Sequence, residues 1–98
     1  MKVFLSHPMS GLSEEEVMKI REEALLHLQN KYNKPFEAID NYHHENVPEN
    51  AGRLWHLGES VKQMEEADYI YFCPNWEDAL GCKVERLIAA IYDLPILK

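Results

Sequence analysis

The chain has 98 residues, which suits a single domain because a chain this short needs most of its apolar residues for one core. Hydrophobic residues make up 46% and charged residues 28%, a globular composition rather than that of a disordered chain. The formal net charge of -7 argues against a nucleic-acid partner, because non-specific binding to DNA or RNA depends on clustered Lys and Arg.

The distribution of apolar and metal-binding residues favours a cytoplasmic protein. No apolar run approaches the roughly 20 residues of a membrane-spanning helix, and Met1–Leu5 turns polar too soon for a signal peptide. Cys73 and Cys82 have no second pair of ligands at zinc spacing, so we expect buried free thiols. His43 and His44 adjoin in an irregular segment, where a solvated loop is more typical than a metal site. We therefore expect no membrane partner, no metal and no cofactor.

In the first third of the chain, a strand and a helix are predicted. Lys2–Ser6 is typical of a short buried strand, and the turn residues His7–Gly11 follow it. Ser13 and Glu16 have the spacing of a capping box, which predicts a helix from there to about Lys31. Apolar residues recur at helical intervals within it, at Val17, Ile20, Ala24 and Leu28.

The middle of the chain predicts a second strand and a second helix. Pro35–Ile39 favours a short strand, and residues 40–50 form a long polar loop. A helix is expected from about Ala51 to Ala67, with its apolar stripe facing a sheet. The stripe consists of Leu54, Leu57, Val61 and Met64.

The last third gives the strongest strand pattern. Tyr69–Cys73 is aromatic and β-branched and ends at Pro74 and Asn75, after which a loop is expected. A third helix follows, marked by Val84, Leu87, Ile88 and Ile91. Leu94–Leu97 predicts a final short strand.

This alternation predicts an α/β fold with three layers, flavodoxin-like or Rossmann-like, around a parallel sheet of four strands in the order 2-1-3-4. In such a sheet the chain leaves the first and third strands toward opposite faces, which opens a crevice where ligands bind. The loops His7–Leu12 and Pro74–Lys83 should line this crevice.

Glu85 is the first candidate for chemistry in that crevice. It lies in the first turns of the third helix, beside Val84, which we expect to face inward. A carboxylate there could attack an electrophilic sugar carbon or orient a ligand hydroxyl, and the helix N-terminus would favour its ionised form. The alternative is a solvated surface glutamate.

Several segments together resemble the nucleoside 2-deoxyribosyltransferase superfamily, and most closely a small, often phage-encoded branch of it. They are Leu57-Gly58-Glu59-Ser60, Ala67 to Phe72, Trp76 to Glu85, and Ser6-His7-Pro8-Met9-Ser10-Gly11. The resemblance implies one such domain over residues 1–98. It also implies hydrolysis or transfer at the N-glycosidic bond of a deoxynucleoside or its monophosphate, with Glu85 as the nucleophile on C1′.

The same resemblance bears on the acid that would protonate the departing nucleobase. The catalytic Asp of that superfamily corresponds to a position near Ser60. Its members also have a tyrosine near the end of the first strand, where this chain has Phe4. Glu59 or Asp78 could supply the acid instead, although only one of Glu59 and Ser60 can share the direction of that Asp, since helical neighbours point about 100° apart. Because both family residues are replaced, the alternative is a non-catalytic module that sequesters or senses a nucleotide.

We expect the ligand to be a nucleoside or nucleotide, bound by residues of both loops. The expected contacts are Ser6, His7, Pro8, Met9, Ser10, Gly11, Trp76 and Gly81. Trp76 would either stack on a base or pack over the sheet edge. A sheet of four strands leaves an edge or a helix face poorly covered, so we also expect a homodimer or larger homo-oligomer.

Overall fold

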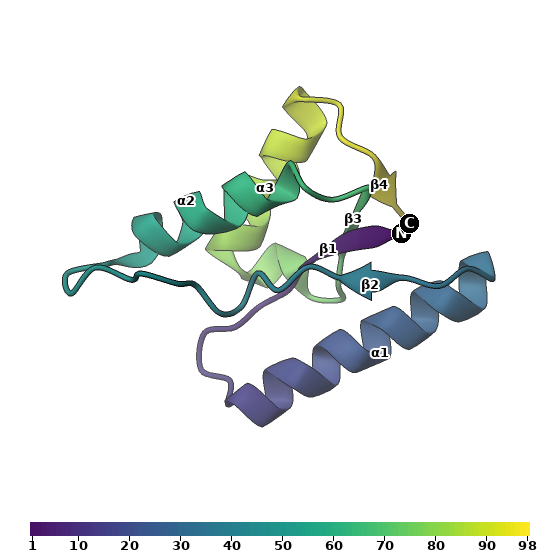
Figure 1. The fold of residues 1–98 in the computed structure, drawn as a ribbon, viewed down its shortest axis with the longest axis horizontal. Helices are drawn as coiled ribbons and strands as arrows, with labels where there is room; N and C mark the ends of the chain where they lie inside the picture. The colour runs from purple at the N-terminus through teal and green to yellow at the C-terminus, as the bar shows by residue number, and fades with distance from the viewer.

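The computed structural model covers residues 1–98 and has the expected α/β architecture (Figure 1). Four parallel strands form one sheet in the order β2-β1-β3-β4, which confirms the predicted topology. The elements are β1 (Lys2–Ser6), α1 (Glu14–Tyr32), β2 (Glu37–Ala38), α2 (Arg53–Met64), β3 (Tyr69–Phe72), the 3-10 helix η1 (Trp76–Asp78), α3 (Leu80–Ile91) and β4 (Ile96–Leu97).

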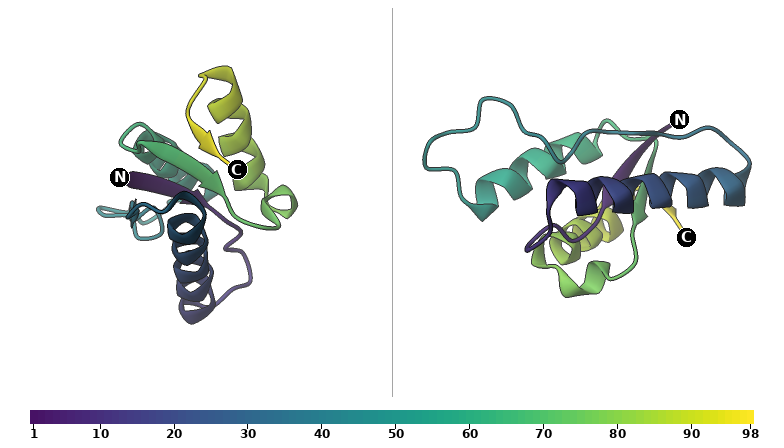
Figure 2. Two further views of the ribbon diagram at one scale, coloured as in Figure 1. Left: turned by 90° about the vertical axis from the view of Figure 1, so that its right-hand side faces the viewer. Right: turned by 90° about the horizontal axis from the view of Figure 1, so that it is seen from below.

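The helices cover both faces of the sheet. Helix α1 lies on one face, and α2 and α3 lie on the other, as the end-on view of Figure 2 shows. Side chains alternate along β1, so Val3 and Leu5 pack in the cluster under α1 while Phe4 packs against the other two helices. All three side chains are fully buried. Strand β1 is therefore the centre of both core layers.

The capping box predicted at the start of α1 is present. The Ser13 hydroxyl accepts a hydrogen bond from the Glu16 backbone N–H, and the Glu16 carboxylate accepts one from the Ser13 backbone N–H. The helix ends where Asn33 adopts a left-handed conformation with φ of 52°. Its buried face contains the predicted Val17, Ala24 and Leu28, and it also contains Arg21.

Several predicted elements are shorter in the structure. Helix α2 starts later than expected because Gly52 is extended at its N-cap. It ends earlier because the backbone N–H groups of residues 65 to 67 donate to carbonyls three positions back, which closes a tight turn. The edge strands β2 and β4 pair over only two residues each, fewer than the predicted 35–39 and 94–97.

The predicted inner faces of α2 and α3 are partly wrong. Leu54 is 82% exposed, and Val84, Leu87 and Ile91 also point to solvent. Helix α3 instead buries Cys82, Glu85 and Ala89. The spacing of large apolar residues identified an apolar face, but small side chains are the ones that allow close packing on the sheet. Val84 therefore does not face inward, whereas its neighbour Glu85 does. None of the helices has the length and apolar character needed to cross a membrane.

Candidate functional site

A hydrogen bond between Ser6 and Glu85 lies at the carboxyl end of β1. Ser6 is the last residue of the strand and points to the same face as Phe4, toward α3. Its hydroxyl donates to Glu85 Oε1 over 2.7 Å, and both side chains are buried. The residue that sequence reasoning singled out for chemistry is thus enclosed by the sheet rather than solvated.

Burial changes the acidity of Glu85. Desolvation raises its pKa to about 7, and the hydrogen bond from Ser6 opposes this rise by stabilising the carboxylate. The second oxygen, Oε2, has no hydrogen-bond partner and is not among the fully enclosed polar atoms, so it keeps contact with the surface. Near neutral pH the group is therefore divided between its protonated and ionised forms.

Cys82 lies one helical turn before Glu85 on the same buried face. Burial raises the pKa of its thiol, the Ser6 hydroxyl lowers it, and the charge of Glu85 raises it. Cys73, after β3, is also buried, and desolvation raises its pKa to about 12. Both cysteines are free thiols, as predicted. Neutral thiols are poor nucleophiles, so Glu85 is a stronger candidate for chemistry in this cluster than either cysteine.

A second polar network fixes the loop after β1 on the opposite face of the sheet. Arg21 Nη1 lies 3.0 Å from His7 Nε2 and donates to Asn41 Oδ1 over 2.8 Å, while Nη2 donates to the Ile39 carbonyl over 2.7 Å. Asn41 Nδ2 in turn donates to the Leu5 carbonyl over 3.0 Å.

Because a guanidinium group can only donate, His7 Nε2 must accept. The ring hydrogen then lies on Nδ1, which donates to the Pro8 carbonyl over 3.2 Å. Burial lowers the pKa of His7, and the charge of Arg21 lowers it further. His7 is therefore neutral, and its hydrogen bonds hold the first loop in place, while its contact with a ligand stays a prediction.

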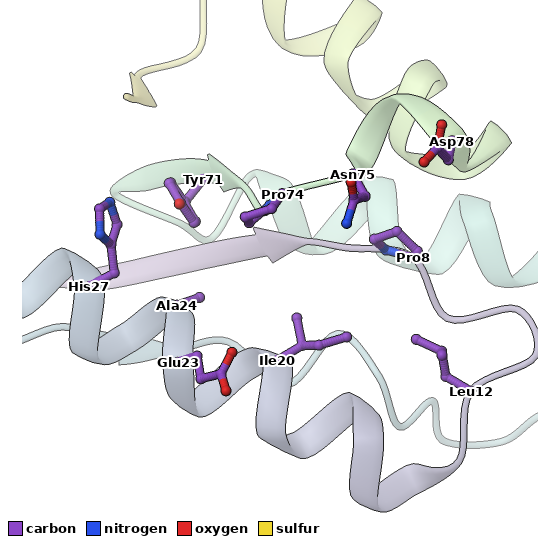
Figure 3. Close-up of a pocket in the computed structure, with 10 residues that line it drawn as sticks. All are labelled: Pro8, Leu12, Ile20, Glu23, Ala24, His27, Tyr71, Pro74, Asn75 and Asp78. Atoms are coloured by element: carbon purple, nitrogen blue, oxygen red, sulfur yellow. The ribbon is translucent and has the colours of Figure 1, made fainter.

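A cavity of about 660 Å³ lies between α1 and the loop after β3 (Figure 3). Its aromatic wall is formed by His27 and Tyr71, whose ring centroids are 5.9 Å apart. The full lining is Pro8, Leu12, Ile20, Glu23, Ala24, His27, Tyr71, Pro74, Asn75 and Asp78. Two predicted site residues, Pro8 and Asp78, line it, but Glu85 does not. The cavity and the Ser6–Glu85 pair lie on different faces of the sheet, at the same edge.

The other predicted contacts do not converge on one point. Ser10 and Gly11 form an exposed turn, with Gly11 at a φ of 80°, and Met9 is more than one-third exposed. Trp76 packs on Phe72 with 5.5 Å between the ring centroids, so it covers the sheet edge. Gly81 is half-buried and faces Leu57.

The position that the resemblance assigns to an aspartate belongs to a cluster that sequence reasoning missed. Ser60 is buried on α2, and its hydroxyl lies 3.4 Å from His44 Nε2. The other ring nitrogen of His44, Nδ1, lies 2.9 Å from His56 Nδ1. Burial and the charge of His56 lower the pKa of His44. Glu59, the neighbour of Ser60, forms an ion pair with Lys62 over 2.6 Å.

These observations define a small doubly wound α/β protein with a buried carboxylate at the point where its sheet reverses strand order. The chain belongs to the DUF4406 family, a domain of unknown function, which matches residues 1–98. No curated protein and no solved structure matches the chain significantly.

Proposed function

We propose that this protein acts at the N-glycosidic bond of a nucleoside or nucleotide, as an N-glycosidase or a deoxyribosyltransferase, with Glu85 as nucleophile. The observation that carries the proposal is the state of this carboxylate. One oxygen is held by Ser6, the other has no partner, and burial raises the pKa to about 7. Perturbed carboxyl groups of this kind cluster at functional sites.

In the proposed reaction, Glu85 Oε2 attacks C1′ of the deoxyribose while the bond from C1′ to the base nitrogen breaks. The electron pair of that bond leaves with the base, which takes a proton from an acid. Water, or the N–H nitrogen of a second base, then attacks C1′, releases the carboxylate and gives its proton to the conjugate base of that acid. The Ser6 hydroxyl holds Oε1 throughout, which keeps Oε2 oriented.

Asp78 is the better of the two acids considered. It is the last residue of η1, which leads directly into α3, the helix that carries Glu85. Glu59 is held by Lys62 in an ion pair. Within this proposal we therefore assign the role of proton donor to Asp78 rather than to Glu59.

A second function, binding without turnover, is favoured by a specific observation. Glu85 does not line the cavity between α1 and the loop after β3, whose aromatic wall of His27 and Tyr71 suits a flat ring. Phe4 and Ser60 stand where the nucleoside 2-deoxyribosyltransferases that this chain resembles have a tyrosine and an aspartate, and both are buried. A non-catalytic module would hold a nucleoside or nucleotide in this cavity and leave its glycosidic bond intact.

The two functions are separated by one panel of deoxynucleosides and their 5′-monophosphates, incubated with and without a second free base. Chromatography follows free base and exchanged nucleoside. We expect turnover by the wild type and none by Glu85→Ala, while Glu77→Ala, an exposed carboxylate in the same loop region, keeps its activity. Calorimetric binding of a panel member with no turnover would establish the binding module instead. Equal turnover by Glu85→Ala and the wild type would exclude Glu85 as nucleophile.

A further inference from the structure

Helix α3 is apolar on the side that faces away from the sheet. Its outward stripe consists of Leu80, Val84, Leu87 and Ile91, which are 68%, 39%, 59% and 69% exposed. The side toward the sheet is also buried, through Cys82, Glu85 and Ala89. A helix that is apolar on both sides is typically covered on both sides. The fold of one chain covers only one of them.

The stripe has the spacing and the residue types of a two-stranded coiled coil. Its members are separated by four, three and four positions, so Leu80 and Leu87 occupy one kind of core position and Val84 and Ile91 the other. Leucine at the first kind and a β-branched residue at the second favour two parallel strands. The pattern therefore matches a second copy of the same helix.

The charge of helix α3 is compatible with pairing between two copies. The chain carries a formal net charge of -7, so two copies repel each other over most of their surfaces. The only acidic residue within α3 is Glu85, which is buried. The other charged residues of the helix are Lys83 and Arg86, and Arg86 lies over the Phe72 ring. Close approach of two copies at α3 therefore brings no exposed acidic side chains of this helix together.

Other exposed apolar side chains lie near both ends of α3. A stable interface buries about 800 Å² on each partner, more than one face of a three-turn helix provides. Tyr92 follows Ile91 directly and is 73% exposed. At the other end, the 82% exposed Leu54 lies one helical turn before Leu57, which faces Gly81.

We propose that the protein forms a homodimer in which the outward stripes of two α3 helices pack side by side in parallel. This inference is independent of the proposed catalytic activity. Because Glu85 lies on the opposite side of the same helix, the dimer would also hold in place the helix that carries this carboxylate.

Sedimentation velocity of the whole protein at micromolar concentration tests the proposal. We expect twice the monomer mass for the wild type. Leu87→Lys should raise the dissociation constant by about 100-fold or more, because it places two like charges in an apolar contact. Leu26→Lys on α1 is the matched control, since Leu26 is also 59% exposed, and it should remain dimeric. Circular dichroism checks that both variants fold.

Disulfide trapping gives a second readout that does not depend on stability. Leu87→Cys should form a covalent dimer under mild oxidation, whereas Leu26→Cys and the wild type, whose thiols are buried, should not. A monomeric wild type, equal dissociation of the two lysine variants, or equal trapping of the two cysteine variants would overturn the proposal.

Discussion

Ser6 and Glu85 are 79 positions apart in the chain and are joined by a buried hydrogen bond of 2.7 Å. The bond links the last residue of the central strand to the helix after β3, across the point where the sheet reverses strand order. The local geometry gives the carboxylate one satisfied oxygen and one without a partner.

The pH dependence of activity should reflect the ionisation of Glu85. Only the ionised carboxylate can attack C1′, and burial places its pKa at about 7. We expect kcat/KM for the best substrate of the panel to rise about tenfold per pH unit below this value as Glu85 ionises, and to fall at higher pH only where the proton donor loses its proton. Initial rates between pH 5 and 8 measure this. A rate that falls over the whole range would mean that the protonated form is the active one.

The same group should make folding stability depend on pH. The folded protein binds a proton at Glu85 up to about pH 7, whereas the unfolded chain releases it near the ordinary value of 4.5. The contribution of Glu85 to stability is therefore largest below pH 4.5 and is lost as the pH rises to about 7.

Glu85→Gln removes this dependence while keeping the shape of the side chain. Relative to the wild type, the variant should gain roughly 2 kcal/mol in free energy of unfolding between pH 5 and pH 8. Urea denaturation of both proteins at the two pH values measures the difference. A constant offset at both pH values would show that Glu85 titrates normally.

Ser6→Ala tests the role of the hydroxyl. It removes the only hydrogen bond that stabilises the carboxylate, so the pKa of Glu85 should rise above 7. The midpoint of the pH profile should move upward, with a loss of about 1 to 2 kcal/mol in stability at neutral pH. Val47→Ala, at an exposed loop position, is the control for a distant truncation. An unchanged midpoint in the Ser6 variant would contradict the proposed contact.

Arg21→Met should destabilise the fold by about 3 kcal/mol, because it leaves His7, Asn41 and the Ile39 carbonyl without their donor. Chemical denaturation measures the loss. Lys19→Met, an exposed cation on the same helix, should change stability by less than about 0.5 kcal/mol. Equal effects of the two substitutions would mean that the buried network adds nothing to stability.

The sequence predicted most of the topology. Alternating strands and helices fix the crossovers of a parallel sheet, and the Ser13 and Glu16 pair predicts the start of α1. Edge strands and helix ends were less accurate because their limits depend on backbone hydrogen bonds that pattern alone does not specify. The Gly52 conformation and the tight turn after Met64 are examples.

The site was predicted only in part. Glu85 was selected because Val84 was expected to face inward, yet the structure buries Glu85 with Cys82 and Ala89 and exposes Val84. The network around Arg21 was missed, although an arginine four positions after Val17 and three before Ala24 lies on the buried stripe of α1. This spacing alone could have predicted that Arg21 is buried. Nothing in the pattern of residues 40–50 indicated that the His44 side chain would lie within hydrogen-bonding distance of His56 and Ser60.

The central claim is tested most directly by mass spectrometry of the protein quenched in acid during turnover of the best substrate of the panel. The account predicts a covalent deoxyribosyl adduct that maps to Glu85 on peptide digestion, absent from Glu85→Gln and present in Glu77→Ala. Base release with no adduct on Glu85, or an adduct on another carboxylate, would contradict it.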